Sequence, residues 1–241
     1  LHEATEADGE GFAHLRVAVS GGASLPGEIA RAFEERFGCT LLEGYGLTET
    51  SPVLTFEPLG KAREGTIGIP VPSTEIACFD DNGKRLPIGE TGEIGARGPQ
   101  IMKGYWKKPD ETEKVMAGDW FLTGDMGEMT ENKDILYHGR ADDMMNAGGF
   151  RVSPLEVEAA LLSHPDIHEV GVTDIEIKAD TRVIAAYYVA DHTLETDALS
   201  AFAAERLARY KQPRLYARVA SLPRNANNKL LRRALPGQTV L

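Results

Sequence analysis

The chain has 241 residues, with 26 basic and 37 acidic side chains and a formal net charge of −11. Its 42% of hydrophobic and 26% of charged residues are typical of a globular protein and exclude a disordered one. We find no apolar run near the ~20 residues of a transmembrane helix, and the polar first residues predict no signal peptide. The two cysteines, Cys39 and Cys78, are too few for a disulfide scaffold and wrongly spaced for a zinc site, which favours a reducing, cytoplasmic compartment.

The first part of the chain predicts a strand, a helix and a second strand. Leu15–Val19 is a short apolar run that enters a glycine turn, and a helix capped by Ser24 is expected to run to Phe37. Thr40–Leu42 then predicts a strand that leads into a turn at Gly44–Gly46. Such α/β units place their ligand loops at the carboxyl ends of the strands.

Short β runs follow, and they predict a small β-barrel-like subdomain at about residues 65–140. Thr74–Phe79 and Lys84–Leu86 flank an Asn-Gly turn and are expected to pair as a hairpin. Glu93–Ala96 predicts a further strand.

The residues after Arg140 predict a separate small domain of helices on a sheet. Ser153 has the spacing of a helix cap, with proline next and the helix ending near Ser163. Three strands and a second amphipathic helix are expected at Val170–Thr173, Val183–Val189, Leu215–Ala220 and Leu199–Leu207. Charge differs as well, since residues 1–140 hold 14 basic and 24 acidic side chains whereas residues 141–241 hold 12 and 13.

Two glycine-containing motifs carry side chains that suit a nucleotide. In Gly44–Thr50, the glycines allow a close backbone approach, Tyr45 offers a stacking face, and Thr48 and Glu49 offer a hydroxyl and a carboxylate suited to Mg²⁺. Asp125 follows Gly124 in what we expect to be an exposed turn, where it can accept both hydroxyls of a ribose. Each motif alone is also compatible with an ordinary turn.

Arg206–Arg233 contains nine basic residues and no acidic one. The run is either a solvated basic face or a site for a phosphorylated ligand. We expect no nucleic-acid partner, because the acidic remainder of the chain would repel it. Within the run, a turn at Pro223–Lys229 presents Lys229.

Six segments occur in an order that resembles the adenylate-forming superfamily, which contains acyl-CoA synthetases and the adenylation domains of peptide synthetases. The resemblance covers about Leu15–Leu235 and is carried by SGGASLP, EGYGLTETSP, GEIGARGPQIMKGYWKKPDET, DWFLTGDMGEM, GRADDMMNAGGFRVSPLEVE and LARYKQP…LPRNANNKLLRR. The GYGLTE and GGFRVSPLEVE forms look most like acyl- or aryl-CoA ligases.

The resemblance implies an α/β fold with two parts. Residues 1–140 would be the C-terminal part of a large α/β plus β-barrel domain, and residues 142–241 a small mobile α+β domain with its hinge at Asp142. The implied reaction activates a fatty or other acyl acid with ATP and Mg²⁺ through an acyl-adenylate. Transfer to coenzyme A then gives acyl-CoA, AMP and pyrophosphate.

The resemblance also implies roles for residues of the large domain. Gly22, Ala23 and Tyr45 would frame the adenine, and Gly46 and Leu47 would line the acyl site. Thr48 would hold a phosphate oxygen, Glu49 would bind Mg²⁺, and Asp125 would take the ribose hydroxyls with Arg140 beside it.

In the small domain, Lys229 would bridge the substrate carboxylate and the α-phosphate during adenylation. Gly148 and Gly149 would let the pantetheine arm of coenzyme A pass after the domain rotates. Asn228 stands where the family usually has glycine, and Asn146 stands where many members have lysine, so we assign Asn146 no catalytic role.

The family's loop for the ATP β- and γ-phosphates is absent from this sequence. We therefore expect a missing N-terminal portion of the same enzyme. Two alternatives are an adenylation domain that loads a carrier protein and a non-catalytic nucleotide-binding fragment. The sequence leaves a homo-oligomer open.

Overall fold

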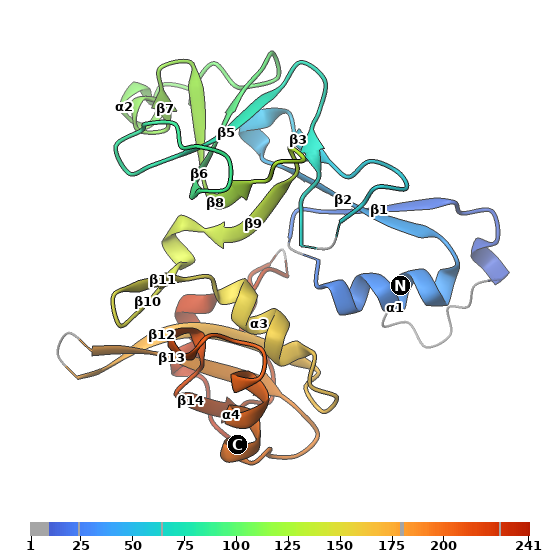
Figure 1. Ribbon diagram of the computed structural model, residues 1–241, viewed down its shortest axis with the longest axis vertical. Coiled ribbons are helices and arrows are strands. Elements are labelled where there is room, and N and C mark those ends of the chain that lie inside the picture. Colours follow the sequence, from blue (N-terminus) through green and yellow to red (C-terminus); the bar gives the residue numbers. More distant parts are fainter. Residues whose placement is uncertain (1–9, 24, 64, 179–180, 227) are drawn as a thin grey trace. The chain divides into compact units, whose positions relative to one another are not determined.

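The computed structural model describes residues 10–23, 25–63, 65–178, 181–226 and 228–241 (Figure 1). The chain divides into two compact units, which we call unit 1 (Leu1–Tyr137) and unit 2 (His138–Leu241). Each unit has its own hydrophobic core. Among the described helices, none is long and apolar enough to span a membrane.

Unit 1 begins with a four-stranded sheet in the order β1-β2-β3-β4, formed by Val17–Gly21, Thr40–Gly46, Val53–Phe56 and Ile69–Pro70. β1 and β2 are parallel, and the helix α1 (Gly27–Phe37) connects them (Figure 1). β3 and β4 add on in antiparallel orientation. The predicted α/β unit is confirmed.

The ends of α1 follow local chemistry. Gly38 adopts a left-handed φ of 62° and its N–H donates to the carbonyl of Glu34, so glycine ends the helix as expected. Pro26 is the N-terminal flanking residue, while the expected cap Ser24 lies outside the described residues. The Gly44–Gly46 prediction was wrong: these residues continue strand β2, because they pair with β3 up to Val53.

A second sheet of unit 1 has the order β5-β6-β8-β7, formed by Glu75–Phe79, Thr91–Arg97, Trp120–Met129 and Met116–Ala117. β9 (Ile135–Arg140) pairs with β8, and the short helix α2 (Pro109–Lys114) precedes β7. The expected hairpin strand Lys84–Leu86 is reduced to a single bridge, between Phe79 and Arg85. The hairpin nevertheless forms, since the Asp80 N–H donates to the Lys84 carbonyl and the Leu86 N–H donates to the Cys78 carbonyl. Asp80 Oδ1 stabilises its turn by accepting the N–H groups of Asn82 and Lys84.

The core of unit 1 joins the two sheets. Leu54 of β3, Ile76 of β5, Ile94 of β6 and Ile135 of β9 are buried in one cluster. Tyr45, at the end of β2, packs partly buried against the same cluster. The core thus brings the glycine-rich end of the first sheet against the second sheet.

Unit 2 starts with the hairpin β10 (Met145–Ala147) and β11 (Phe150–Val152). The helices α3 (Pro154–Leu162) and α4 (Thr196–Ala204) accompany a sheet in the order β12-β13-β14, formed by Glu169–Lys178, Thr181–Val189 and Leu215–Arg218. The expected helices and strands are confirmed, and the Ser153 hydroxyl accepts the N–H of Glu156 as an N-cap should.

Strand β13 separates two clusters of buried side chains because alternate residues point to opposite faces. Ile184, Ala186 and Tyr188 lie in the cluster that includes residues of α3 and α4. Ala185 and Tyr187 lie in a second cluster with residues of the C-terminal segment. That segment contains the 3-10 turn η5 (Arg232–Gly237), so both faces of the sheet are covered.

Candidate functional site

The carboxyl ends of β1 and β2 lie side by side. Gly21 is in register with Gly44, and a Cβ atom on Gly21 would lie 3.1 Å from the Gly44 carbonyl oxygen. The turn at Gly22 follows β1 with a φ of 83°, which favours glycine. Gly22, Ala23 and Tyr45 therefore come from adjacent strand ends.

Asp125 is the centre of a buried polar contact. The Tyr45 hydroxyl donates to its Oδ2 at 2.6 Å and the Tyr137 hydroxyl donates to its Oδ1 at 3.1 Å. The two tyrosine rings are 5.7 Å apart. Burial, and next the charge of Asp125, raise the pKa of Tyr45 far above its ordinary value, so this hydroxyl remains a proton donor.

The expectation of an exposed turn at Asp125 was wrong. Asp125 is 3% exposed and lies within β8, which continues through Gly124 with a φ of 73°. The Gly124 N–H donates to a carboxylate oxygen of Glu93 on the neighbouring strand β6. This hydrogen bond keeps Gly124 in the sheet despite its positive φ. A carboxylate has about four lone-pair positions, so it can accept more hydrogen bonds than those from the two tyrosines.

A 3-10 turn, η2 (Thr48–Thr50), follows β2 and presents Thr48 and Glu49. The Thr50 hydroxyl accepts the Leu47 N–H at 2.9 Å and fixes this turn, while Leu47 packs against the unit 1 core. Gly46 allows its own backbone to lie close to that of Pro52, because a Cβ atom at position 46 would lie 1.7 Å from the Pro52 carbonyl oxygen. A side chain at position 46 is therefore excluded by the backbone.

Glu49 is held by the segment that follows β6. The Tyr105 hydroxyl donates to its Oε1 at 2.9 Å, and the Met102 N–H donates to its carbonyl oxygen at 2.8 Å. Among the described residues there is no group of three or more His, Cys, Asp or Glu side chains that could hold a metal. Glu49, with the exposed hydroxyl of Thr48 beside it, fits a Mg²⁺ ion whose other ligands are phosphates and water.

Glu43 precedes this glycine segment and lies beside a second carboxylate. The Glu43 N–H donates to Glu57 Oε2 at 2.7 Å. Burial raises the pKa of the Glu43 side chain to about 7, and the negative charge of Glu57 adds to the increase. A backbone hydrogen bond from Leu25, in the loop between β1 and α1, acts in the opposite direction.

In unit 2, Lys229 stands exposed on a tight turn. The Asn225 amide oxygen accepts the Lys229 N–H, and the Asn225 N–H donates to the Lys229 carbonyl. Asn228 has a φ of 60°, the left-handed conformation that asparagine tolerates. The turn closes with a bridge between Arg224 and Leu230.

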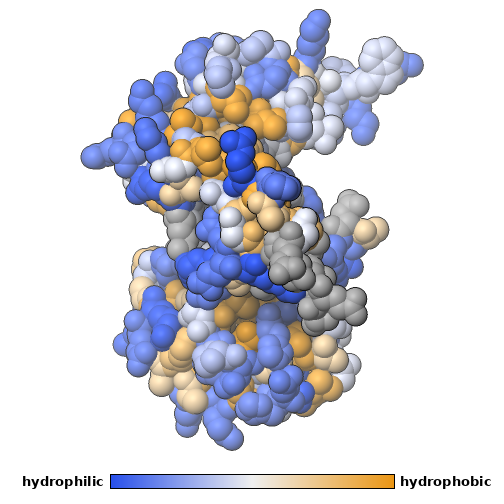
Figure 2. Space-filling model, turned by 90° about the vertical axis from the view of Figure 1, so that its right-hand side faces the viewer, coloured by the Kyte–Doolittle hydropathy of each residue, from blue (hydrophilic) through white to orange (hydrophobic). Residues whose placement is uncertain are grey.

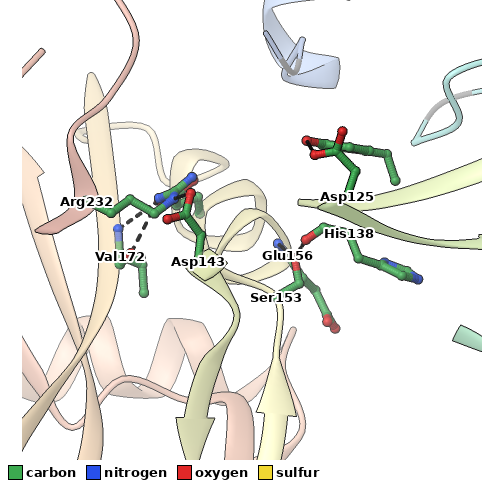
Figure 3. A network of polar contacts seen from close by, with 9 residues as sticks. Asp125, His138, Asp143, Ser153, Glu156, Val172 and Arg232 are labelled. Atoms are coloured by element: carbon green, nitrogen blue, oxygen red, sulfur yellow. Dashed lines mark hydrogen bonds and ion pairs between the residues drawn. The ribbon is translucent and has the colours of Figure 1, made fainter. Parts of the chain in front are cut away.

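Arg232 joins the segment after Lys229 to the expected hinge. Figure 3 shows its guanidinium close to Asp143 and to the Val172 backbone, and it also forms an ion pair with both carboxylate oxygens of Glu158. Its Nε lies 3.7 Å from Asp143 Oδ2. The side chains of Arg232 and Glu158 are only 12% and 13% exposed, so this ion pair is largely shielded from water.

Asp142 is exposed in the 3-10 turn η3 (Ala141–Asp143), directly after Arg140. An open pocket of about 250 Å³ lies between this turn and the segment Leu230–Arg233, with Arg140 in its lining. The division between the two units falls at Tyr137/His138, a few residues before Asp142.

Gly148 and Gly149 form the exposed two-residue turn of the β10–β11 hairpin. Their φ values are 58° and 88°, and the Asn146 amide oxygen accepts the Gly149 N–H. Glycine is therefore required here by the turn itself. Next to it, the rings of Phe150 and Tyr210 are 4.5 Å apart and both are exposed.

The basic run of residues 206–233 is less positive than its sequence suggests, because carboxylates from other segments pair with it. Lys211 pairs with Glu156 at 2.6 Å, and Arg232 pairs with Glu158. Arg206 and Arg224 also face carboxylates. The two interpretations of the run, a solvated basic face and a site for a phosphorylated ligand, both remain predictions.

The structure brings together Gly22, Ala23 and Tyr45–Glu49 at one end of the first sheet, and Tyr45 reaches Asp125. In unit 2 it places Arg140 and Asp142 at one pocket and Lys229 directly beside that pocket's lining. Sequence reasoning missed Tyr105, Tyr137 and Arg232. Only the position of Arg232 soon after Lys229 could have drawn attention to it.

Two family models match this chain. The model described as AMP-binding enzyme matches residues 1–106, and the model described as AMP-binding enzyme C-terminal domain matches residues 156–229.

A long-chain-fatty-acid–CoA ligase of Bacillus subtilis is 41% identical over 225 residues, which are 92% of this chain and 40% of that ligase. The ATP-bound structure of MatB from Rhodopseudomonas palustris has a TM-score of 0.90 at 31% identity, covering 98% of this chain and 48% of that one. O-succinylbenzoate coenzyme A synthetase (MenE) from Bacillus subtilis, in complex with ATP and a magnesium ion, has a TM-score of 0.82 at 34% identity. That match covers 92% of this chain and 46% of MenE.

This chain thus spans less than half the length of these relatives. The two models occur in the expected order, and the solved structures share the fold. The chain therefore belongs to the AMP-binding enzymes, the adenylate-forming family that its motifs resemble.

Proposed function

We propose that the protein containing this chain is an AMP-forming acyl-CoA synthetase. It activates a carboxylic acid with ATP to an acyl-adenylate and then transfers the acyl group to coenzyme A. The observation that carries the proposal is the cluster at the end of β2, where Tyr45 and Asp125 are joined beside the turn of Thr48 and Glu49. Relatives named as CoA ligases support it.

Adenylation requires that two anions meet. The substrate carboxylate attacks the α-phosphate of ATP, forming a new P–O bond while pyrophosphate leaves. Lys229 bridges the carboxylate and the α-phosphate and offsets their charges, and Thr48 holds a phosphate oxygen. When bound at Glu49, Mg²⁺ would neutralise phosphate charge. Asp125 accepts the ribose hydroxyls, and Gly22, Ala23 and Tyr45 frame the adenine.

Thioester formation follows with a different arrangement. The thiolate of coenzyme A attacks the acyl carbon, and AMP leaves. The small domain rotates about Asp142 between the two steps, with Lys229 serving the first. The exposed turn of Gly148 and Gly149 lies on the path of the pantetheine arm, and the exposed rings of Phe150 and Tyr210 offer an apolar face beside it.

A missing N-terminal portion of the same enzyme completes the site in this proposal. Hydrophobic side chains reach the surface of the protein (Figure 2), and Val19 on β1 is 61% exposed. β1 pairs with β2 in parallel and ends the described sheet. Parallel strands are ordinarily buried on both faces. In this proposal, the N-terminal portion of the enzyme packs on β1 and covers exposed side chains such as Val19.

The acid is a fatty or other acyl acid, and the compartment is the cytoplasm. The names of the relatives indicate different acid substrates, since one is named for long-chain fatty acids and another for O-succinylbenzoate. Gly46 and Leu47 contribute to the acyl site in this proposal.

The test is AMP release by the longest natural protein that contains this chain, measured with a panel of carboxylic acids and with or without coenzyme A. We expect pyrophosphate release with the correct acid and AMP release only when the thiol is added. AMP release that needs a carrier protein in place of coenzyme A would support an adenylation domain. Nucleotide binding without either product would identify a non-catalytic protein.

A further inference from the structure

The side chains of Tyr105 and Glu49 are joined by a hydrogen bond, although 56 residues separate them in sequence. The Tyr105 O–H donates to Glu49 Oε1 at 2.9 Å. The oxygen Oε2 of the same carboxylate lies outside this bond. A carboxylate held at one oxygen presents the other in a defined direction, which is what a cation ligand requires.

The segment that carries Tyr105 is itself fixed at several points. The Tyr105 N–H donates to the Thr112 hydroxyl at 2.9 Å, and that hydroxyl donates to the Lys108 carbonyl. At the other end, the Met102 N–H donates to the carbonyl of Glu49 itself. The hydroxyl of Tyr105 is thus positioned by α2 on one side and by the backbone of η2 on the other.

We propose that Tyr105 is a positioning residue that orients the Glu49 carboxylate for Mg²⁺. The inference rests on the proposed function, in which Glu49 binds Mg²⁺ together with ATP. Tyr105 touches neither the cation nor the nucleotide in this arrangement. Its hydrogen bond restricts the rotation of the Glu49 side chain, so its loss weakens Mg²⁺ binding without removing a ligand.

The test compares Tyr105→Phe with the unchanged protein across a Mg²⁺ titration. The longest natural protein that contains this chain is used, with pyrophosphate release as one readout. Calorimetric binding of a non-hydrolysable ATP analogue at increasing Mg²⁺ is the second readout. We expect the Mg²⁺ midpoint to rise on the order of ten-fold in both, as is typical when a hydrogen-bond partner of a metal ligand is lost. At saturating Mg²⁺, kcat should return to within about two-fold of the original value.

Two further variants separate positioning from a general structural role. Tyr188→Phe is the matched control, because it removes a tyrosine hydroxyl that is bonded to the Leu194 backbone in unit 2 and should leave the midpoint unchanged. Glu49→Gln should raise the midpoint more than Tyr105→Phe does. Adding Tyr105→Phe to Glu49→Gln should produce no further rise, because the residue acts only through Glu49.

The outcomes are distinguishable. If Glu49→Gln shifts the midpoint and Tyr105→Phe does not, the positioning role is wrong and the proposed function stands. If Glu49→Gln shifts nothing, the metal assignment fails and the inference fails with it. Equal loss of activity at every Mg²⁺ concentration in Tyr105→Phe would also overturn the inference. Should that variant be unfolded, Thr112→Ala keeps the Tyr105 hydroxyl but frees its backbone, and an unchanged midpoint there would overturn it as well.

Discussion

Asp125→Ala should lower both the stability of unit 1 and its affinity for nucleotides. The carboxylate accepts two tyrosine hydroxyls in a site that is 3% exposed. Alanine would leave the hydroxyls of Tyr45 and Tyr137 without this acceptor. The aspartate is therefore expected to be structural as well as a ligand for the ribose.

The magnitude follows from the two hydrogen bonds. A hydrogen bond to a charged acceptor contributes about 1.5–3 kcal/mol to stability. Losing two such bonds, offset in part by the other contacts of the two tyrosines, gives a decrease of about 3 kcal/mol in the free energy of unfolding. For a unit of this size, that corresponds to a decrease in melting temperature of about 10 °C.

The assay is thermal unfolding followed by circular dichroism, with calorimetric AMP binding measured below the transition. Tyr45→Phe in the Asp125→Ala background is the informative comparison. It removes one of the two hydroxyls that lost the carboxylate acceptor, so it should restore about 1 kcal/mol of stability. Asp125→Asn keeps one acceptor oxygen and should be less destabilised than Asp125→Ala.

An unchanged melting temperature in Asp125→Ala would refute the reasoning from burial. A further loss of stability on adding Tyr45→Phe would refute the role of the hydroxyls that lost their carboxylate acceptor. Unchanged AMP affinity would remove Asp125 from the nucleotide site while leaving its structural role intact.

Three further predictions concern both units. Lys229→Ala should reduce acyl-adenylate formation on the order of 10²–10³-fold and spare thioester formation from preformed acyl-adenylate, and equal losses in the two half-reactions would contradict its assignment. Asp142→Pro fixes φ and disfavours the helical conformation of Ala141 in η3, so single-turnover measurements should show acyl transfer to coenzyme A falling more than adenylation. Loss of both steps together with a lowered melting temperature would instead make Asp142 structural. The pKa of Glu43 is raised from 4.5 to about 7. The folded state therefore binds the proton more tightly, and unfolding free energy should fall by up to about 3 kcal/mol as pH rises from 4.5 to 7. Glu43→Gln should flatten this dependence in denaturant titrations, and an unchanged slope would exclude Glu43 as its source.

Local signals predicted the ends of elements well. Gly38 ends α1 and Ser153 caps α3, and both effects depend on residues within one helical turn. Asn228 adopts the left-handed conformation for the same kind of local reason. The motif order also identified the residues at the carboxyl ends of β1 and β2.

Contacts between distant segments could not be predicted in this way. Tyr45 and Asp125 are 80 residues apart, and their contact depends on how the second sheet packs on the first. The same packing buries Asp125, which a Gly-Asp pair alone would place in a turn. The ion pairs of the basic run could not be predicted from the run alone, because its partners, such as Glu156 and Glu158, lie on α3 far earlier in the chain.

The shielded ion pair of Arg232 has a consequence for conformational entropy. Arg232 lies three residues after Lys229 and is held to Glu158 on α3 and to Asp143 beside the expected hinge. The segment after the lysine turn and the residue next to the expected hinge are thereby linked to each other within unit 2. In the proposed reaction, a rotation about Asp142 would therefore move the Lys229 backbone together with unit 2, and the lysine side chain would be the part left to be ordered in each catalytic cycle.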